Sequence, residues 1–134
     1  MPTDCISYQN SGYFSPLMND YLEQKSNLQS LYNRFPNFEN FKAQILEKKE
    51  NFEDQNRTVL VSVLRKQYSK ISVSSLTQQN IEALASPDTF TITTGHQLNL
   101  FTGPLYFLYK IISTINLTKE LKAKYPAQNF VPIY

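Results

Sequence analysis

One stretch of the chain changes abruptly in character, from strand-like to loop-like to helix-like residues. Residues 89–94 combine threonines with apolar side chains in alternation, the pattern of a β-strand with one apolar face. The residues that follow, 95–103, contain the only histidine of the chain and two of its three glycines. Gly103-Pro104 then opens an apolar pattern with helical spacing. We predict a strand at 89–94, a loop, and a helix at 104–124.

A second strand is predicted after this helix. Tyr125-Pro126 ends the helical pattern, and residues 130–134 are again apolar and aromatic. Strand, helix and strand in this order form a βαβ unit, in which the two strands lie parallel. A buried parallel strand needs neighbouring strands, so we expect an α/β protein of which this chain is the first part. Most of the sheet would then lie beyond Tyr134.

The stretch from Thr89 to Leu117 differs from the rest of the chain in its charge. Between Thr89 and Leu117 the only charged residue is Lys110, so we expect this stretch to be the most deeply buried part of the fold. In the later half of the helix, Ile115 and Leu121 are expected to point inward. The sequence therefore suggests two parts, a helical region at 1–87 and the incomplete start of a parallel α/β core at 88–134.

The first 87 residues are predicted to be mainly helical. Cys5–Tyr8 is expected to form a short edge strand. Ser15 before Pro16 predicts a helix start, and apolar residues keep to one face of this helix as far as Phe35. Three more helices are predicted, from Phe38 to Phe52, from a cap at Asn56 through Tyr68, and from a cap at Ser74 or Ser75 to residues 86–88, the last with Ile81 and Leu84 inward.

Composition excludes several classes of partner. Thirteen Lys and Arg against eleven Asp and Glu give a formal net charge of +2, which offers no electrostatic case for nucleic acid or an acidic membrane. The single cysteine, Cys5, cannot form an internal disulfide, and residues 1–4 lack the features of a signal peptide. We expect a cytoplasmic protein. The apolar run 98–117 is interrupted by Gly103-Pro104 and Lys110, so we expect a buried helix there and no membrane span.

The loop carries the candidate chemistry. His96 is the candidate catalytic residue, because a histidine at the carboxyl end of a strand can exchange a proton near neutral pH while a neighbour fixes its tautomer. Amide side chains beside it can recognise hydroxyl or carboxylate groups. The predicted substrate- or nucleotide-binding residues are Thr94, Gly95, Gln97, Asn99, Thr102 and Gly103. No carboxylate pair and no Cys/His set has metal-ligand spacing, so no metal site is predicted.

Each of these residues also has a structural interpretation. His96 can close a turn by hydrogen bonding to the backbone, and Thr102 can cap the following helix. The role of Gly103 can be purely structural, to permit the turn before Pro104. Lys110 is expected to extend to the surface and not to bind phosphate. The residue types alone leave both interpretations open.

Residues 93–107, TTGHQLNLFTGPLYF, together with Lys110-Ile111, resemble the signature of the bacillithiol-biosynthesis cysteine-adding enzymes. The resemblance extends less specifically to Gly12–Ser15, Asp20–Leu22 and Phe130–Pro132. It implies a Rossmann-like catalytic core related to class I nucleotidyltransferases and aminoacyl-tRNA synthetases. It also implies a reaction, the addition of L-cysteine to the amine of glucosaminyl malate, and a homodimer formed through a coiled coil that is absent from this chain.

On this resemblance, Gly95-His96 takes the place of a histidine-containing nucleotide-binding motif, which makes ATP a candidate cofactor. Position 99 is Asn where the relatives have a second histidine, so adenylate chemistry at this loop stays open. Family members run to several hundred residues, and this chain would cover roughly their first quarter. We expect the isolated chain to be inactive.

Two other functions remain as alternatives. One is a non-catalytic helical scaffold or interaction domain, in which His96 only closes a turn. The other is a nucleotidyltransferase-like enzyme that forms the adenylate of another small acid.

Overall fold

The computed structural model describes residues 4–97 and 99–134, together with all of their side chains except that of Thr102. The elements, in order, are α1 (Tyr8–Ser11), α2 (Pro16–Leu22), the 3₁₀ helix η1 (Ser26–Leu31), α3 (Phe38–Asn51), α4 (Asp54–Tyr68), α5 (Ser75–Ala83), β1 (Thr89–Thr93), the 3₁₀ helix η2 (Leu100–Thr102), α6 (Leu105–Lys124) and β2 (Asn129–Ile133). The chain divides into two compact units, residues 1–44 and 45–134. The division at residue 87 that composition suggests stays a prediction.

Two predictions for the first unit are wrong. The edge strand expected at Cys5–Tyr8 is absent from the described residues, because Ser7 instead caps the short helix α1 by accepting a hydrogen bond from the backbone N–H of Asn10. Ser15 does cap α2 as predicted, accepting from the N–H of Met18. That helix, however, ends at Leu22 and does not continue to Phe35.

The chain reverses at Gln24, which has a left-handed φ of 55°. The N–H of Lys25 then bonds back to the carbonyl of Asp20 at 3.0 Å, an arrangement that ends a helix. Beyond this turn Tyr21 meets Tyr32 and Phe35, with ring centroids 5.3 and 5.2 Å apart. The apolar spacing that suggested one long helix face therefore reflects contacts across a bend.

The other predicted helices are confirmed, with small shifts. α3 matches the helix expected from Phe38, and α4 begins at Asp54, two residues before the expected cap at Asn56. Ser74 caps α5, its hydroxyl accepting from the N–H of Thr77. Ile81 and Leu84 are buried, as predicted.

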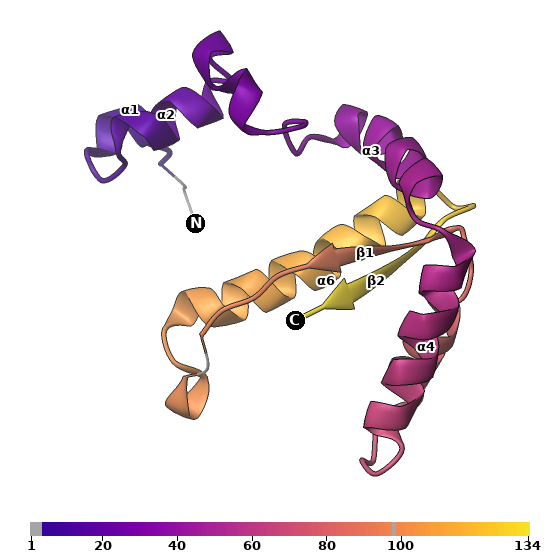
Figure 1. The fold of residues 1–134 in the computed structure, drawn as a ribbon. Coiled ribbons are helices and arrows are strands. Elements are labelled where there is room, and N and C mark those ends of the chain that lie inside the picture. The colour runs from indigo at the N-terminus through magenta and orange to yellow at the C-terminus, as the bar shows by residue number, and fades with distance from the viewer. Residues whose placement is uncertain (1–3, 98) are drawn as a thin grey trace. The chain divides into compact units, whose positions relative to one another are not determined.

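The βαβ unit is present as predicted (Figure 1). β1 and β2 pair in parallel, from Thr89 opposite Asn129 to Thr93 opposite Ile133. The ladder extends at both ends, where the N–H of Asn129 bonds to the carbonyl of Asp88 and the N–H of Thr94 to the carbonyl of Ile133. α6 connects the two strands. The fold is of the α/β class.

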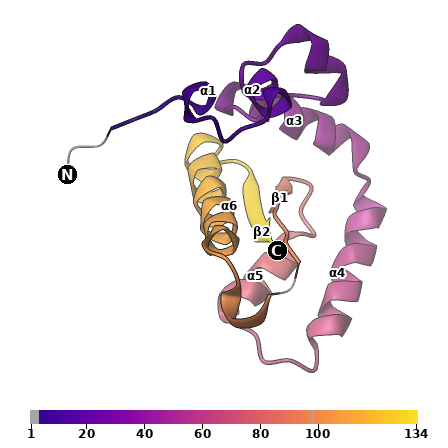
Figure 2. The ribbon, with the colours of Figure 1, turned by 90° about the vertical axis from the view of Figure 1, so that its left-hand side faces the viewer.

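Helices lie on both sides of the two strands. α6 lies on one side, with α4 across from it on the other (Figure 2). Val131 of β2 forms a buried cluster with three residues. These are Val61 of α4, Ile81 of α5 and Leu84, the C-cap residue of α5. The strands therefore form the middle of three layers, as in other parallel α/β proteins.

The buried stripe of α6 differs from the prediction. Leu121 is fully buried as expected, but Ile115 is 37% exposed. The buried residues are instead Thr114, Thr118 and Leu121, which share one face by their i, i+4, i+7 spacing. Thr118 satisfies its hydroxyl by donating to the carbonyl of Ile115 at 2.7 Å. Thr118 can therefore occupy this face without leaving its hydroxyl unpaired.

One side of α6 between residues 105 and 112 is uncovered within this chain, so the stretch 89–117 is not its most deeply buried part. Its exposed apolar residues are Leu105, Tyr106, Leu108, Tyr109 and Ile112. A two-stranded sheet can cover only one side of a helix that is apolar nearly all round. No helix among the described residues is both long and apolar enough to cross a membrane.

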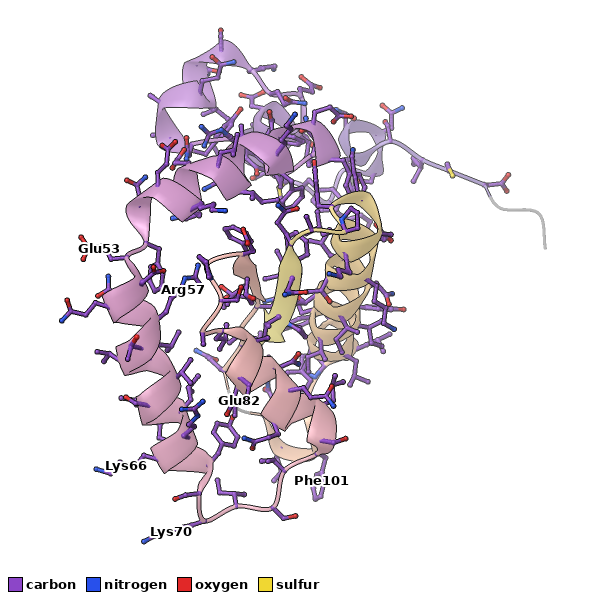
Figure 3. All side chains as sticks on the ribbon, turned by 90° about the vertical axis from the view of Figure 1, so that its right-hand side faces the viewer. Glu53, Arg57, Lys66, Lys70, Glu82 and Phe101 are labelled. Atoms are coloured by element: carbon purple, nitrogen blue, oxygen red, sulfur yellow. The ribbon has the colours of Figure 1, made fainter. Side chains whose placement is uncertain are left out.

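A buried arginine joins α4 to the start of β1, a contact that was not predicted. Arg57 is only 5% exposed and extends from α4 toward the turn before the strand (Figure 3). Its Nη1 donates to the carbonyls of Leu84 and Thr89 at 3.2 and 3.0 Å, and its Nη2 to that of Pro87 at 3.5 Å. The ring of Phe52 lies 5.1 Å from the guanidinium carbon. One side chain thus satisfies carbonyls at the end of α5 and at the first residue of β1.

We predict that Arg57→Met destabilises the complete protein by about 2–4 kcal/mol, because it removes charged hydrogen bonds and leaves buried carbonyls unpaired. Denaturant-induced unfolding measures this loss. Arg65→Met is the matched control on the same helix. Arg65 makes an exposed ion pair with Glu82, so its replacement should shift the transition far less. Equal shifts for the two variants would contradict the role given to Arg57.

We also predict that residues 1–134, prepared alone, self-associate through the exposed half of α6. Each large apolar side chain that becomes buried contributes about 1.5–3 kcal/mol. Light scattering at increasing concentration should show the association. The double variant Leu105→Lys, Ile112→Lys should reduce it. If the chain stays monomeric at all concentrations, the exposed apolar residues of α6 do not drive self-association.

Candidate functional site

The candidate site lies at the carboxyl ends of both strands. In parallel sheets these ends share one edge, and ligands of α/β proteins usually bind there. The loop 94–104 leaves β1 at this edge, and Tyr134 follows β2 at the same edge. The Tyr134 hydroxyl donates to the backbone carbonyl of His96 at 3.3 Å. Residues from both strand ends therefore meet here.

Both ring nitrogens of His96 have partners within the chain. Nε2 lies 2.8 Å from the Tyr106 hydroxyl on α6. Nδ1 lies 2.9 Å from the carbonyl oxygen of Gln97 and 2.9 Å from Nδ2 of Asn99. Nδ1 can donate to the carbonyl or accept from the amide, but not both, so the two tautomers have different partners.

Aromatic rings surround the half-buried imidazole. The ring of Tyr106 lies 4.9 Å from it and that of Phe107 lies 6.4 Å from it, both edge to face. Phe107 in turn packs against Tyr134 at 5.3 Å. Such edge-to-face contacts are favourable and directional, so they fix the plane of the imidazole.

Lys110 turns toward the loop. It is exposed, as predicted, but its Nζ lies 3.4 Å from the carbonyl oxygen of Gly95 and 5.7 Å from the centroid of the Tyr106 ring. Tyr106 and Lys110 are four residues apart and so share one face of α6. The ammonium group is held next to the His96–Tyr106 pair.

Gly103 is required by the shape of the loop. Its φ of 58° and ψ of −149° fall in a region that essentially only glycine adopts. A Cβ at this position would lie 2.4 Å from Cβ of Asn99. Asn99 is also held by a 2.7 Å hydrogen bond from its Nδ2 to the carbonyl of Gln97. The close approach of Gly103 thus places the Asn99 amide beside His96.

The predicted site residues contribute in different ways. His96 and Asn99 lie together, and Gln97 joins them through its carbonyl. The backbone of Gly95 is open, with no atom within 4 Å of the position of a Cβ. The alternative interpretation of Thr102 as the helix cap does not hold, since Pro104 occupies the N-cap of α6. The side chain of Thr102 lies outside the described part of the chain.

Thr94 lies at a separate hollow next to the loop. The hollow has a volume of about 160 Å³ and is mostly apolar. Its lining residues are Thr94, Ile111, Thr114, Ile115, Pro132, Ile133 and Tyr134. Tyr134 connects it to His96 through the hydrogen bond described above. A small ligand group at the strand ends could enter this hollow.

Sequence reasoning missed Tyr106 and Tyr134 as partners of His96. The signal for Tyr106 was the helix start at Gly103-Pro104, because the first turns of a helix after such a loop face back toward it. Tyr134 had no comparable signal, since its proximity depends on the parallel register of β2 with β1.

The groups that converge here are an imidazole, amides, hydroxyls and an ammonium. They suit a ligand with carboxylates or hydroxyls. Among the residues that the structure describes, no three His, Cys, Asp or Glu side chains gather in a way that could hold a metal ion.

A family model described as bacillithiol biosynthesis BshC, N-terminal Rossmann-like domain, matches residues 1–134. The chain belongs to this family. Proteins named "Putative cysteine ligase BshC" from Flavobacterium johnsoniae and Flavobacterium psychrophilum are 70% and 66% identical to it over its full length. One from Bacillus cereus is 33% identical over 86% of the chain and 21% of its own length.

The chain spans about a quarter of the length of the two Flavobacterium BshC proteins. It corresponds to the N-terminal Rossmann-like domain of the family. No solved structure matches it.

We predict that Gly103→Ala disrupts the loop of the complete protein, at a cost of about 1–3 kcal/mol in backbone strain. Limited proteolysis should then cut the loop 95–103 faster. Gly95→Ala is the control, because its Cβ would meet open space and its φ is not left-handed. Equal cleavage rates in both variants would show that the Gly103 backbone relaxes without strain.

Proposed function

We propose that the complete protein is a cysteine ligase, which joins the carboxyl group of L-cysteine to the amine of glucosaminyl malate and so forms bacillithiol. The observation that carries this proposal is the match of the BshC family model along the whole chain, including the loop around His96. The long motif at 93–107 supports it, because it includes the residues that cluster at the strand ends.

The substrates fit the groups at the site. Cysteine and the malate part of glucosaminyl malate carry carboxylates, and the sugar carries hydroxyls. Lys110 supplies a positive charge, and the Asn99 amide and the Thr94 hydroxyl supply polar contacts. We assign substrate or nucleotide binding to Thr94, Gly95, Gln97, Asn99, Thr102 and Gly103. ATP is the candidate cofactor for activating the carboxyl group.

His96 is the proposed acid–base group. The amine must lose a proton as the amide bond forms, and an imidazole is suited to accept it near neutral pH. The proposal extends to a cytoplasmic homodimer formed through a coiled coil outside this chain.

The test uses the complete protein with L-cysteine and glucosaminyl malate, with and without ATP, and detects bacillithiol by mass. We expect product to form. Nucleotide consumption with another small acid, and none with cysteine, would favour an adenylate-forming enzyme of different specificity. No reaction in any combination would favour the scaffold interpretation.

We predict that His96→Ala lowers kcat/KM by about 10²-fold or more, with little change in thermal stability. If His96 only holds the loop together, stability should instead fall by about 1–3 kcal/mol while the folded protein keeps its activity. Both quantities should be measured on the same preparation.

A further inference from the structure

The contacts of His96 raise a question about how it could reach a substrate. Its Nδ1 faces the Gln97 carbonyl and the Asn99 amide, and its Nε2 faces the Tyr106 hydroxyl. The imidazole therefore has no unengaged nitrogen to offer to a ligand in this arrangement. Tyr106 differs, since it is 48% exposed and, within the described part of the chain, its hydroxyl contacts one partner, Nε2 of His96 at 2.8 Å.

A hydroxyl has one proton to donate and two lone pairs that accept. When the Tyr106 hydroxyl donates to Nε2, its lone pairs stay available to a hydrogen-bond donor on a substrate. An amine that forms an amide is such a donor. The geometry thus puts the tyrosine oxygen, and not the imidazole, at the accessible end of the pair.

We propose that Tyr106 is the catalytic residue that contacts the substrate amine and that His96 is the base behind it. This inference rests on the proposed cysteine-adding function. In the step, the amine nitrogen bonds to the activated carboxyl carbon of cysteine, and the activating group leaves with the electron pair of its bond to that carbon. A proton moves from the amine nitrogen to the Tyr106 oxygen, while the Tyr106 proton moves to Nε2 of His96. The positive charge that develops on the nitrogen is thereby transferred to the imidazole, and tyrosine is neutral before and after.

The loop offers a partner to the tautomer that this step needs. With the proton on Nδ1, the ring donates to the Gln97 carbonyl at 2.9 Å, and the Asn99 amide donates to the same carbonyl at 2.7 Å. Nε2 is then free of a proton and accepts from Tyr106. After the transfer the imidazolium donates from both nitrogens, to Gln97 and to Tyr106. No partner has to move.

Lys110 acts in this scheme as a positioning residue. Its ammonium is tied to the Gly95 carbonyl and lies over the Tyr106 ring, so it restrains the ring that carries the hydroxyl. The same charge attracts substrate carboxylates to this position. Tyr134 is a further titratable group that faces the loop, and its hydroxyl is bonded to the His96 backbone carbonyl and not to the imidazole ring.

Kinetics of the complete protein test this proton relay, in which the proton of the substrate amine passes through Tyr106 to His96. Tyr106→Phe and His96→Ala should each lower kcat by about 10²-fold, and the double variant should be no worse than either one, because the two groups act as a unit. Tyr109→Phe is the matched control, since it removes an exposed hydroxyl from the same helix and should leave kcat unchanged. His96→Gln should stay inactive, because an amide can accept the tyrosine hydrogen bond but not its proton.

Two kinetic outcomes would overturn the inference. If Tyr106→Phe retains more than about a tenth of the activity while His96→Ala loses a hundredfold, then Tyr106 only orients the imidazole. If His96→Gln is as active as the wild-type protein while His96→Ala is not, then His96 only orients the tyrosine.

A measurement independent of turnover separates this inference from the proposed function. Selective ¹⁵N labelling of histidine in the complete protein, with the His96 signals assigned by their loss in His96→Ala, reports which ring nitrogen carries the proton. We expect an unprotonated, hydrogen-bonded Nε2 that changes in Tyr106→Phe and not in Tyr109→Phe. If wild-type protein forms no bacillithiol, the proposed function fails while this spectrum still reports on the pair. If bacillithiol forms and Tyr106→Phe changes neither kcat nor the spectrum, the relay alone fails.

Discussion

The parallel hydrogen-bond ladder between β1 and β2 determines where the rest of the second unit can lie. Two parallel strands cannot be joined by a hairpin, so the chain must return through a crossover, here the 20 residues of α6. A helix of this length spans about 30 Å, whereas a five-residue strand spans about 17 Å. The buried residues of α6 begin at its middle, with Thr114, and continue to Leu121, over the strands. Its first half therefore extends past the carboxyl ends of the strands, and this overhang brings Tyr106 and Lys110 to the loop.

The elements of the βαβ unit could be predicted because each has a local signal. Alternation marks β1, Gly103-Pro104 marks the start of α6, and the parallel pairing follows from their order. The turn at Gln24 could not be predicted in this way, because a non-glycine residue in a left-handed conformation leaves no pattern in the sequence. Arg57 was missed for a related reason. Its burial depends on carbonyls 27 to 32 residues away, which only the packing of α4 against α5 and β1 brings together.

The candidate site shows the same division between local and distant information. His96, Asn99 and Gly103 belong to one short loop, so their residue types already indicated a polar cluster at a strand end. The partners of the imidazole ring come from further away, and Tyr106 reaches it only because α6 begins directly after the loop and turns back over it. Thr102 could have been the cap of α6 by residue type, but Gly103 and the extended backbone of Pro104 separate it from the helix.

The contact between Gly103 and Asn99 has a consequence for how this loop can vary during evolution. The atom of Asn99 that a side chain at position 103 would strike first is Cβ, at 2.4 Å. Every residue other than glycine carries a Cβ, so the restriction on position 103 holds whichever of them occupies position 99. The loop can thus exchange the chemical group at position 99, for example an amide for a second imidazole, and keep the same backbone path. The side-chain chemistry at position 99 and the backbone path through position 103 are therefore separate constraints on this loop.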